Sequence, residues 1–149
     1  MFRLADLITP DRIVDLNGTS KDEVLKEMVE VLDKAPEVTD KEAFHRAILD
    51  RESILSTGIG LGIAVPHAKI SSVTGLVAAL GKTKRGINYG ALDDQAVHIV
   101  VMIGANDAQQ SDYIRALARV TLLLKNEKIR TAIVNADSPN NVYDILKEY

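Results

Sequence analysis

Residues 96–104 read Ala-Val-His-Ile-Val-Val-Met-Ile-Gly, a stretch in which His98 is the one polar side chain. A strand with one solvated face alternates polar and apolar residues, whereas a strand covered on both faces reads as an unbroken apolar run. Residues 96–104 therefore predict a central strand with helices on each side, and hence a layered α/β domain. A second strand is expected at residues 75–83.

Two helices are expected before these strands. The capping box Ser20-Lys21-Asp22-Glu23 precedes apolar residues at helical spacing and predicts an amphipathic helix over residues 20–35. A second box, Thr39-Asp40-Lys41-Glu42, predicts another helix, with Arg51 near its C-terminal end. The buried face of this second helix is expected to comprise Ala43, Phe44, Ala47 and Ile48.

Three further helices are expected after residue 104. Asp107-Ala108-Gln109-Gln110 is a weaker capping signal for a long helix that breaks near Asn126, and a short helix follows at residues 128–135. Ser138-Pro139 starts a last helix, with proline in its first position. The long helix is expected to bury Ile114, Leu117, Ala118, Thr121 and Leu122.

Interleaved strands and helices predict a mixed central β-sheet flanked by helices on both faces. The 149 residues with 46% hydrophobic content suffice for one core, so residues 1–149 are expected to form a single domain. No repeat or linker interrupts the sequence.

Composition excludes several classes of function. The net charge is −3 and the basic residues are spread along the sequence, so nucleic-acid binding is not expected. Cysteine is absent, which removes disulfides, thiolate nucleophiles and sulfur-ligated zinc together. The N-terminus has an acidic residue, Asp6, where a signal peptide needs an apolar block, and no apolar run is long enough to insert in a membrane. The expected location is the cytoplasm.

The best candidate for chemistry lies between Thr57 and Lys69, in Thr-Gly-Ile-Gly-Leu-Gly-Ile-Ala-Val-Pro-His-Ala-Lys. Pro66 lacks an N–H and biases Val65 toward extended geometry, so a strand should stop there and place His67 on a rim. Three alternating glycines leave the backbone accessible on one side.

The segments Arg51-Glu52, Ser56-Thr57-Gly58-Ile59-Gly60 and Gly62-Ile63-Ala64-Val65-Pro66-His67 resemble the signature of a known family. It is the enzyme IIA family of the phosphotransferase system, of the mannitol/fructose type, and the nearest likeness is to its nitrogen-regulatory branch. The resemblance covers nearly the whole chain and implies the same α/β architecture.

The resemblance also implies the roles of individual residues. The histidine after the proline, here His67, would receive a phosphoryl group from a histidine phosphocarrier protein, and Arg51 matches the family's arginine. Many members carry a second active-site histidine where this chain has Tyr113, whose hydroxyl can donate a hydrogen bond but cannot carry positive charge. Thr57 and the backbone amides of Gly58 and Ala68 are further candidate phosphate contacts.

Each residue has an ordinary structural alternative. Arg51 could be only a favourable charge at a helix C-terminus. Tyr113 could be an amphipathic tyrosine that packs its ring on the core. His45 is expected to be a half-exposed helix residue, and His98 a hydrogen-bonded strand histidine.

No cofactor or metal is expected. Three scattered histidines without a His-Glu-x-x-His helix do not suggest zinc. The three glycines do not match Gly-x-Gly-x-x-Gly, since position 63 is isoleucine, and no Gly-Lys-Ser/Thr follows them.

Three functions remain open. The preferred hypothesis is a regulatory phosphoacceptor, whose phosphorylation on His67 changes its binding to cytoplasmic target proteins; the nitrogen-regulatory likeness and the chain's end at Tyr149, without a fused transporter domain, favour it. The alternative is a sugar-specific component that passes the phosphoryl group to a permease IIB subunit. The third is a degenerate binding module that carries no phosphate, suggested by Tyr113.

Overall fold

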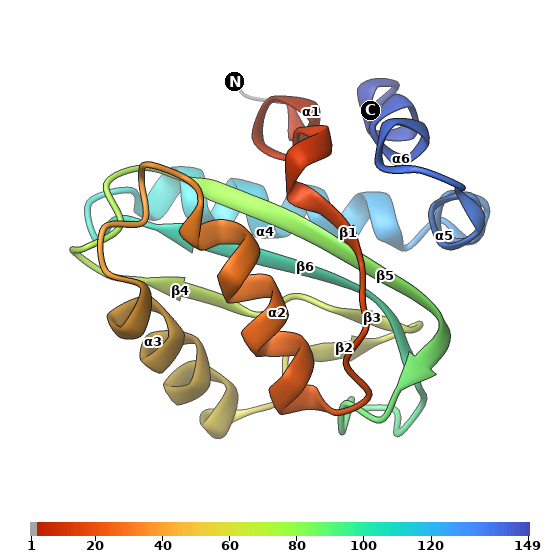
Figure 1. Ribbon diagram of the computed structural model, residues 1–149, viewed down its shortest axis with the longest axis horizontal. Helices are drawn as coiled ribbons and strands as arrows, with labels where there is room; N and C mark the ends of the chain where they lie inside the picture. The colour runs from red at the N-terminus through yellow and green to blue at the C-terminus, as the bar shows by residue number, and fades with distance from the viewer. Residues whose placement is uncertain (1–2) are drawn as a thin grey trace.

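The structure, a computed structural model, describes residues 3–149 and forms a single α/β domain (Figure 1). A mixed sheet lies between two layers of helices, with one hydrophobic cluster on each face of the sheet. The predicted fold class is confirmed. Met1 and Phe2 lie outside the described residues.

The elements have the following bounds. The helices are α1 (Leu4–Leu7), the short 3-10 helix η1 (Pro10–Arg12), α2 (Lys21–Asp33), α3 (Lys41–Ile54), α4 (Gln110–Leu124), α5 (Glu127–Asn135) and α6 (Pro139–Lys147). The strands are β1 (Ile13–Asp15), β2 (Gly58–Gly60), β3 (Ile63–Ala64), β4 (His67–Lys69), β5 (Val77–Ile87) and β6 (Val97–Ala105).

The sheet is built around β6. Its strand order is β1-β5-β6-β3-β2, and β4 also pairs with β6, beyond the end of β3. Strands β5 and β6 are antiparallel, whereas β3 and β4 both run parallel to β6. In Figure 1, α2 and α3 cover one face, while α4 and α5 lie on the other.

The central strand predicted at residues 96–104 is β6, which is displaced from the prediction by one residue. Its side chains alternate between the two cores: Val100 and Met102 pack in the cluster that contains α2 and α3, whereas Val101 and Ile103 pack in the cluster that contains α4 to α6. Each face of β6 is therefore covered, which is why the sequence of the strand does not alternate. Strand β5, predicted at 75–83, continues to Ile87.

Two helix starts can be compared with the predictions. The Ser20 hydroxyl accepts a hydrogen bond from the Glu23 amide at 3.2 Å and caps α2 as expected. The cap of α3 is Asp40, whose carboxylate accepts from the Ala43 amide at 3.0 Å, and not Thr39. The Thr39 hydroxyl instead donates to the Ser72 carbonyl.

The predicted buried face of α4 is wrong. The side chains that α4 buries are Ala116, Val120, Leu123 and Leu124. Ile114 and Leu122, which were expected in the core, are 52% and 73% exposed. The helix carries apolar residues on two adjacent stripes at helical spacing, so the sequence alone could not indicate which stripe meets the sheet. Asp107 does not cap this helix either; its N-cap is Gln109, which makes no capping hydrogen bond.

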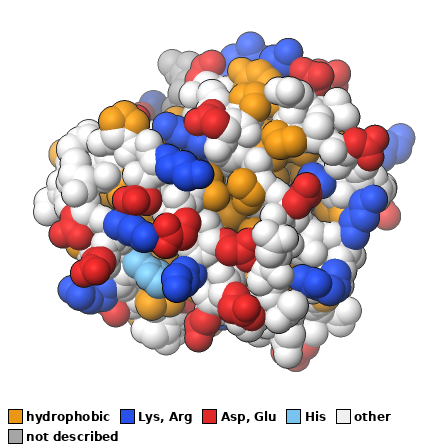
Figure 2. Space-filling view, viewed as in Figure 1, with side chains coloured by type: hydrophobic (Ala, Val, Ile, Leu, Met, Phe, Trp, Pro, Cys, Tyr) orange, Lys and Arg blue, Asp and Glu red, His pale blue; other side chains and the backbone are white. Residues whose placement is uncertain are grey.

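Surface charge on the face covered by α2 and α3 is mixed, with acidic and basic side chains interspersed (Figure 2). Within residues 3–149, no helix is both long enough and apolar enough to cross a membrane.

Candidate functional site

His67 is presented by an interruption in the sheet. Strand β3 pairs with β6 through Ala64 and Val100, and β4 resumes the same parallel pairing through His67 and Ile103. Between the two strands stands Pro66, which has no N–H to contribute to the ladder. The strand stops at Ala64, close to the predicted stop, and His67 begins a second short strand.

The break fixes the orientation of the imidazole. Nδ1 of His67 lies 2.7 Å from the carbonyl oxygen of Val65. Because a carbonyl can only accept, Nδ1 carries the proton in the neutral ring, and Nε2 is left with the lone pair. His67 is half-buried, as a rim position requires. The backbone carbonyl that holds the ring had no signal in the sequence.

The surroundings of His67 favour the neutral imidazole. Burial lowers the pKa of His67 below its ordinary value, and the charge of Arg51 lowers it further, against the opposing effects of the Val65 hydrogen bond and of Glu52. A neutral imidazole is the form that can act as a nucleophile.

Tyr113 lies beside His67. The two ring centroids are 5.6 Å apart and the ring planes meet at 63°, an edge-to-face contact. Burial raises the pKa of Tyr113 to about 12, although the charge of Arg51 acts against this shift. The phenol therefore stays protonated at neutral pH and can donate a hydrogen bond.

Lys69 is a cation of this site that sequence reasoning missed. It lies two residues after His67 in β4, so both side chains point to the same face of the strand. Its ammonium lies 5.7 Å from the centroid of the Tyr113 ring and donates to the side-chain oxygen of Gln110 at the start of α4. The two-residue spacing from His67 was the signal that could have found it.

Arg51 occupies the last turn of α3. Its Nη1 donates to the Leu55 carbonyl at 2.9 Å, which is the helix-terminus role considered from the sequence. Its charge also lowers the pKa of both His67 and Tyr113, so the guanidinium lies within electrostatic range of the two rings. One hydrogen bond leaves most donors of the guanidinium available.

Thr57 belongs to a buried network around Glu52. The Glu52 carboxylate, 8% exposed, accepts hydrogen bonds from the Thr57 hydroxyl and the Thr57 amide, at 2.5 and 2.7 Å. It also accepts from the Tyr89 hydroxyl at 2.7 Å and pairs with the Lys21 ammonium at 2.9 Å. The Thr57 hydroxyl is thus turned inward and engaged with Glu52 and Tyr89.

The two candidate backbone amides are also engaged or enclosed. The Gly58 amide donates to the Ser56 hydroxyl at 3.1 Å. Ala68 is buried within β4, in register with Gly104 of β6. Of the sequence candidates, His67 and Tyr113 are brought into contact and Arg51 acts on both, whereas Thr57, Gly58 and Ala68 belong to the supporting structure.

The other histidines lie outside this group. His45 is half-exposed on α3. His98 lies at the start of β6, and its Nδ1 is 2.9 Å from the carbonyl oxygen of Thr83 in β5. Within residues 3–149, no three acidic, histidine or cysteine side chains gather in a way that could hold a metal ion.

Comparison with known proteins places this arrangement in a class. The family described as "Phosphoenolpyruvate-dependent sugar phosphotransferase system, EIIA 2" matches residues 6–149. The fold and the match define a phosphoryl-transfer component. The chain belongs to the EIIA 2 family of this phosphotransferase system.

Individual relatives differ in their described roles. The chain is 40% identical over 149 residues to the "PTS system fructose-specific EIIABC component" of Bacillus subtilis. The match covers 99% of this chain but only 24% of that relative's length. It is 30% identical to the "PTS system fructose-specific EIIA component" of Haloferax volcanii, over 95% of this chain and 93% of that protein. It is 28% identical to a "Nitrogen regulatory protein" of Bradyrhizobium diazoefficiens, over 96% and 94% of the two chains.

A solved structure gives the same fold. The nitrogen regulatory protein IIA-Ntr from Neisseria meningitidis superimposes with a TM-score of 0.89, at 21% identity, over 96% of this chain and 98% of that one. At this identity the likeness speaks for the fold alone.

Proposed function

We propose that the chain is a sugar-specific phosphohistidine carrier of the fructose type, which accepts a phosphoryl group on Nε2 of His67. The observation that carries the proposal is the hydrogen bond between Nδ1 of His67 and the Val65 carbonyl, which leaves Nε2 as the nucleophilic nitrogen of a half-buried, neutral imidazole. The donor would be a histidine phosphocarrier protein, and the acceptor a permease IIB subunit.

The transfer needs no further co-reactant. The lone pair of Nε2 attacks phosphorus, the P–N bond of the donor phosphohistidine breaks, and the donor imidazole leaves with that electron pair. The His67 ring gains positive charge, which its Nδ1–H shares with the Val65 carbonyl. Returning the group to the next acceptor reverses these roles.

Three side chains would stabilise the transferred group, because its charge is spread over three oxygens. Arg51 supplies a planar fork that can hold two oxygens, Lys69 a point charge, and Tyr113 a neutral donor. Positioned donors of this kind supply most of the rate in phosphoryl transfer.

The fructose reading replaces the sequence-based preference for the nitrogen-regulatory branch. Two fructose-specific relatives, at 40% and 30% identity, support it against 28% for the nitrogen regulatory protein. The regulatory reading remains the second candidate. Deleting the gene separates the two: loss of growth and uptake on fructose supports the carrier, whereas normal uptake with altered nitrogen responses contradicts it.

The decisive experiment incubates the purified chain with phosphoenolpyruvate and the general phosphotransferase components. Mass spectrometry should show the gain of one acid-labile phosphoryl group. His67→Ala should abolish the gain, whereas His45→Ala and His98→Ala, the two matched controls, should keep it. If the unaltered chain gains nothing, the degenerate binding module is the better reading; if His67→Ala is modified equally, the site is wrong.

A further inference from the structure

A cavity lies at the opposite end of β6 from His67. It has a volume of about 340 Å³, is open to solvent, and is lined by the turn between β2 and β3, by β5, by the start of β6 and by α5. Ile99 lines it, whereas Ile103 of the same strand pairs with His67. Four residues of β-strand separate these positions by about 13 Å, so the cavity is distinct from the phosphoryl-transfer site.

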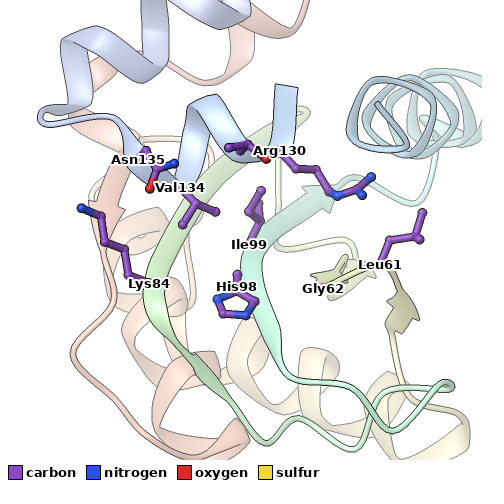
Figure 3. A pocket seen from close by; sticks show the side chains of 9 residues that line it. Leu61, Gly62, Lys84, His98, Ile99, Arg130, Val134 and Asn135 are labelled. Carbon is purple, nitrogen blue, oxygen red and sulfur yellow. The ribbon is translucent and has the colours of Figure 1, made fainter. Parts of the chain in front are cut away.

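Figure 3 shows how the cavity is arranged. Val134 of α5 and Ile99 of β6 lie in its middle, with the His98 ring below them. Lys84 and Asn135 lie on one side, and the guanidinium of Arg130 extends to the other, towards Leu61. An apolar floor thus lies between two polar ends.

The charge of the lining has one sign. Of the described residues that line the cavity, none is acidic. Lys82, two residues before Lys84 on β5, pairs with Asp15 at 2.7 Å, but within residues 3–149 no carboxylate pairs with Lys84. Arg130 uses its Nη1 for the carbonyls of Leu124 and Lys125, at 2.9 and 2.8 Å, which leaves its other N–H groups available.

His98 adds a polar group at the base. Its Nδ1 donates to the Thr83 carbonyl, so Nε2 of the neutral ring is an acceptor, for example for a hydroxyl of the ligand. The ring fits between two glycines with positive φ: a Cβ on Gly62 would lie 3.5 Å from Cδ2, and a Cβ on Gly86 would lie 3.0 Å from Cε1. Both glycines therefore leave room for the imidazole at the cavity.

We infer that this cavity binds a small organic anion, of the size of a sugar phosphate, whose phosphate or carboxylate group meets Lys84 and whose carbon skeleton lies on Ile99 and Val134. The volume falls at the lower end of the range for small-molecule sites. Cationic and neutral donors around an apolar floor match a ligand with a charged end and an uncharged body. The inference does not depend on phosphorylation of His67.

The test is a titration of the full chain that is monitored by ¹H–¹⁵N NMR. The probes are fructose 6-phosphate, citrate and inorganic phosphate, and uncharged fructose is the control. Fructose 6-phosphate or citrate should shift the amides of Leu61, Gly62, Thr131 and Asn135, and fructose should not. Shifts by fructose 6-phosphate alone assign a phosphate ligand, and shifts by citrate alone a carboxylate ligand. Absence of shifts with both, or shifts confined to residues around His67, would overturn the inference.

Two variants and one control locate the binding. Lys84→Ala should weaken binding about fivefold, the size expected for one partly exposed charge pair. Lys26→Ala, an exposed lysine on α2 away from the cavity, should bind as the unaltered chain does. Thr131→Trp, at an exposed position on α5, should block the cavity and abolish the shifts. Equal affinities for Lys84→Ala and Lys26→Ala would contradict the assignment.

Discussion

The rings of His67 and Tyr113 meet edge to face, with their centroids 5.6 Å apart. The family resemblance implies that this contact places a phenol where many members carry a second histidine. It keeps a hydrogen-bond donor at the site while removing a group that could become cationic.

Replacing Tyr113 tests the role of the phenol. Tyr113→Phe keeps the ring against His67 but removes the hydroxyl, so transfer should slow about tenfold to a hundredfold, as for loss of one hydrogen bond to a charged group. Single-turnover transfer from the phosphorylated donor measures the rate. Tyr143→Phe on α6 is the control. An unchanged rate in Tyr113→Phe would mean that the tyrosine only packs.

Replacing Arg51 with lysine preserves charge and removes the fork. Arg51→Lys should slow transfer about tenfold or more, because one ammonium cannot hold two phosphoryl oxygens in the same plane. Arg46→Lys, at an exposed position of the same helix, should transfer normally. Equal rates for the two variants would show that only the charge of Arg51 matters, as at any helix C-terminus.

The rate of phosphoryl acceptance should depend on pH through His67. Its pKa lies below the ordinary value of 6.5, chiefly because of burial. The nucleophile is the neutral ring, so the rate should stay level as the pH falls through 6.5 and decline only below the lowered pKa. A pH–rate profile with an NMR titration of the His67 ring checks this. A midpoint above 6.5 would contradict it.

Removing Glu52 should destabilise the protein. Glu52→Ala leaves the buried Thr57 and Tyr89, and the half-buried Lys21, without their shared acceptor, which should cost about 3–5 kcal/mol in the free energy of unfolding. Urea denaturation measures this cost. Asp50→Ala, at an exposed position of the same helix, should change stability by less than about 0.5 kcal/mol.

The Glu52 network also predicts how stability varies with pH. Burial opposes ionisation, but the hydrogen bonds of Thr57 and Lys21 prevail and hold the pKa of Glu52 below 4.5 in the folded state. Its stabilising contribution should be complete above the unfolded value of 4.5 and be lost as the pH falls through the lowered folded value. Glu52→Gln should flatten this part of the profile. A profile that keeps its acid slope in Glu52→Gln would assign the slope to other carboxylates.

Gly58 should tolerate no side chain. A Cβ at this position would lie 2.8 Å from both Cα and Cβ of Ala91, so Gly58→Ala should cost about 1–3 kcal/mol of stability. At Gly75 a Cβ would meet only the flexible Glu37 side chain, at 3.3 Å. Thermal unfolding should therefore show a much smaller effect for Gly75→Ala, and equal effects would contradict the steric argument.

The sequence predicted the elements whose local pattern is unambiguous. The unbroken apolar run of β6 indicated burial on both faces, and Ser20 capped its helix, because both signals are local. The predicted buried face of α4 and the predicted cap of α3 were wrong. Tertiary packing decided which of two apolar stripes α4 buries, and which of the adjacent residues Thr39 and Asp40 caps α3.

The site was predictable only in part. The motif around Pro66 drew attention to His67, and the family likeness to Arg51 and Tyr113. The carbonyl that orients the ring belongs to the backbone and leaves no residue-type signature. The inward turn of Thr57 depends on Glu52 and Tyr89, a partnership across the fold that no sequence spacing reveals.

The missing amide at Pro66 has a consequence for engineering. Since a main-chain oxygen steers the imidazole, exchanging the neighbouring side chains leaves that guide in place. Changing the orientation of the ring would instead require changing the backbone at the break between β3 and β4, where Pro66 stands. The reactivity of His67 thus depends on a break in the strand pairing with β6.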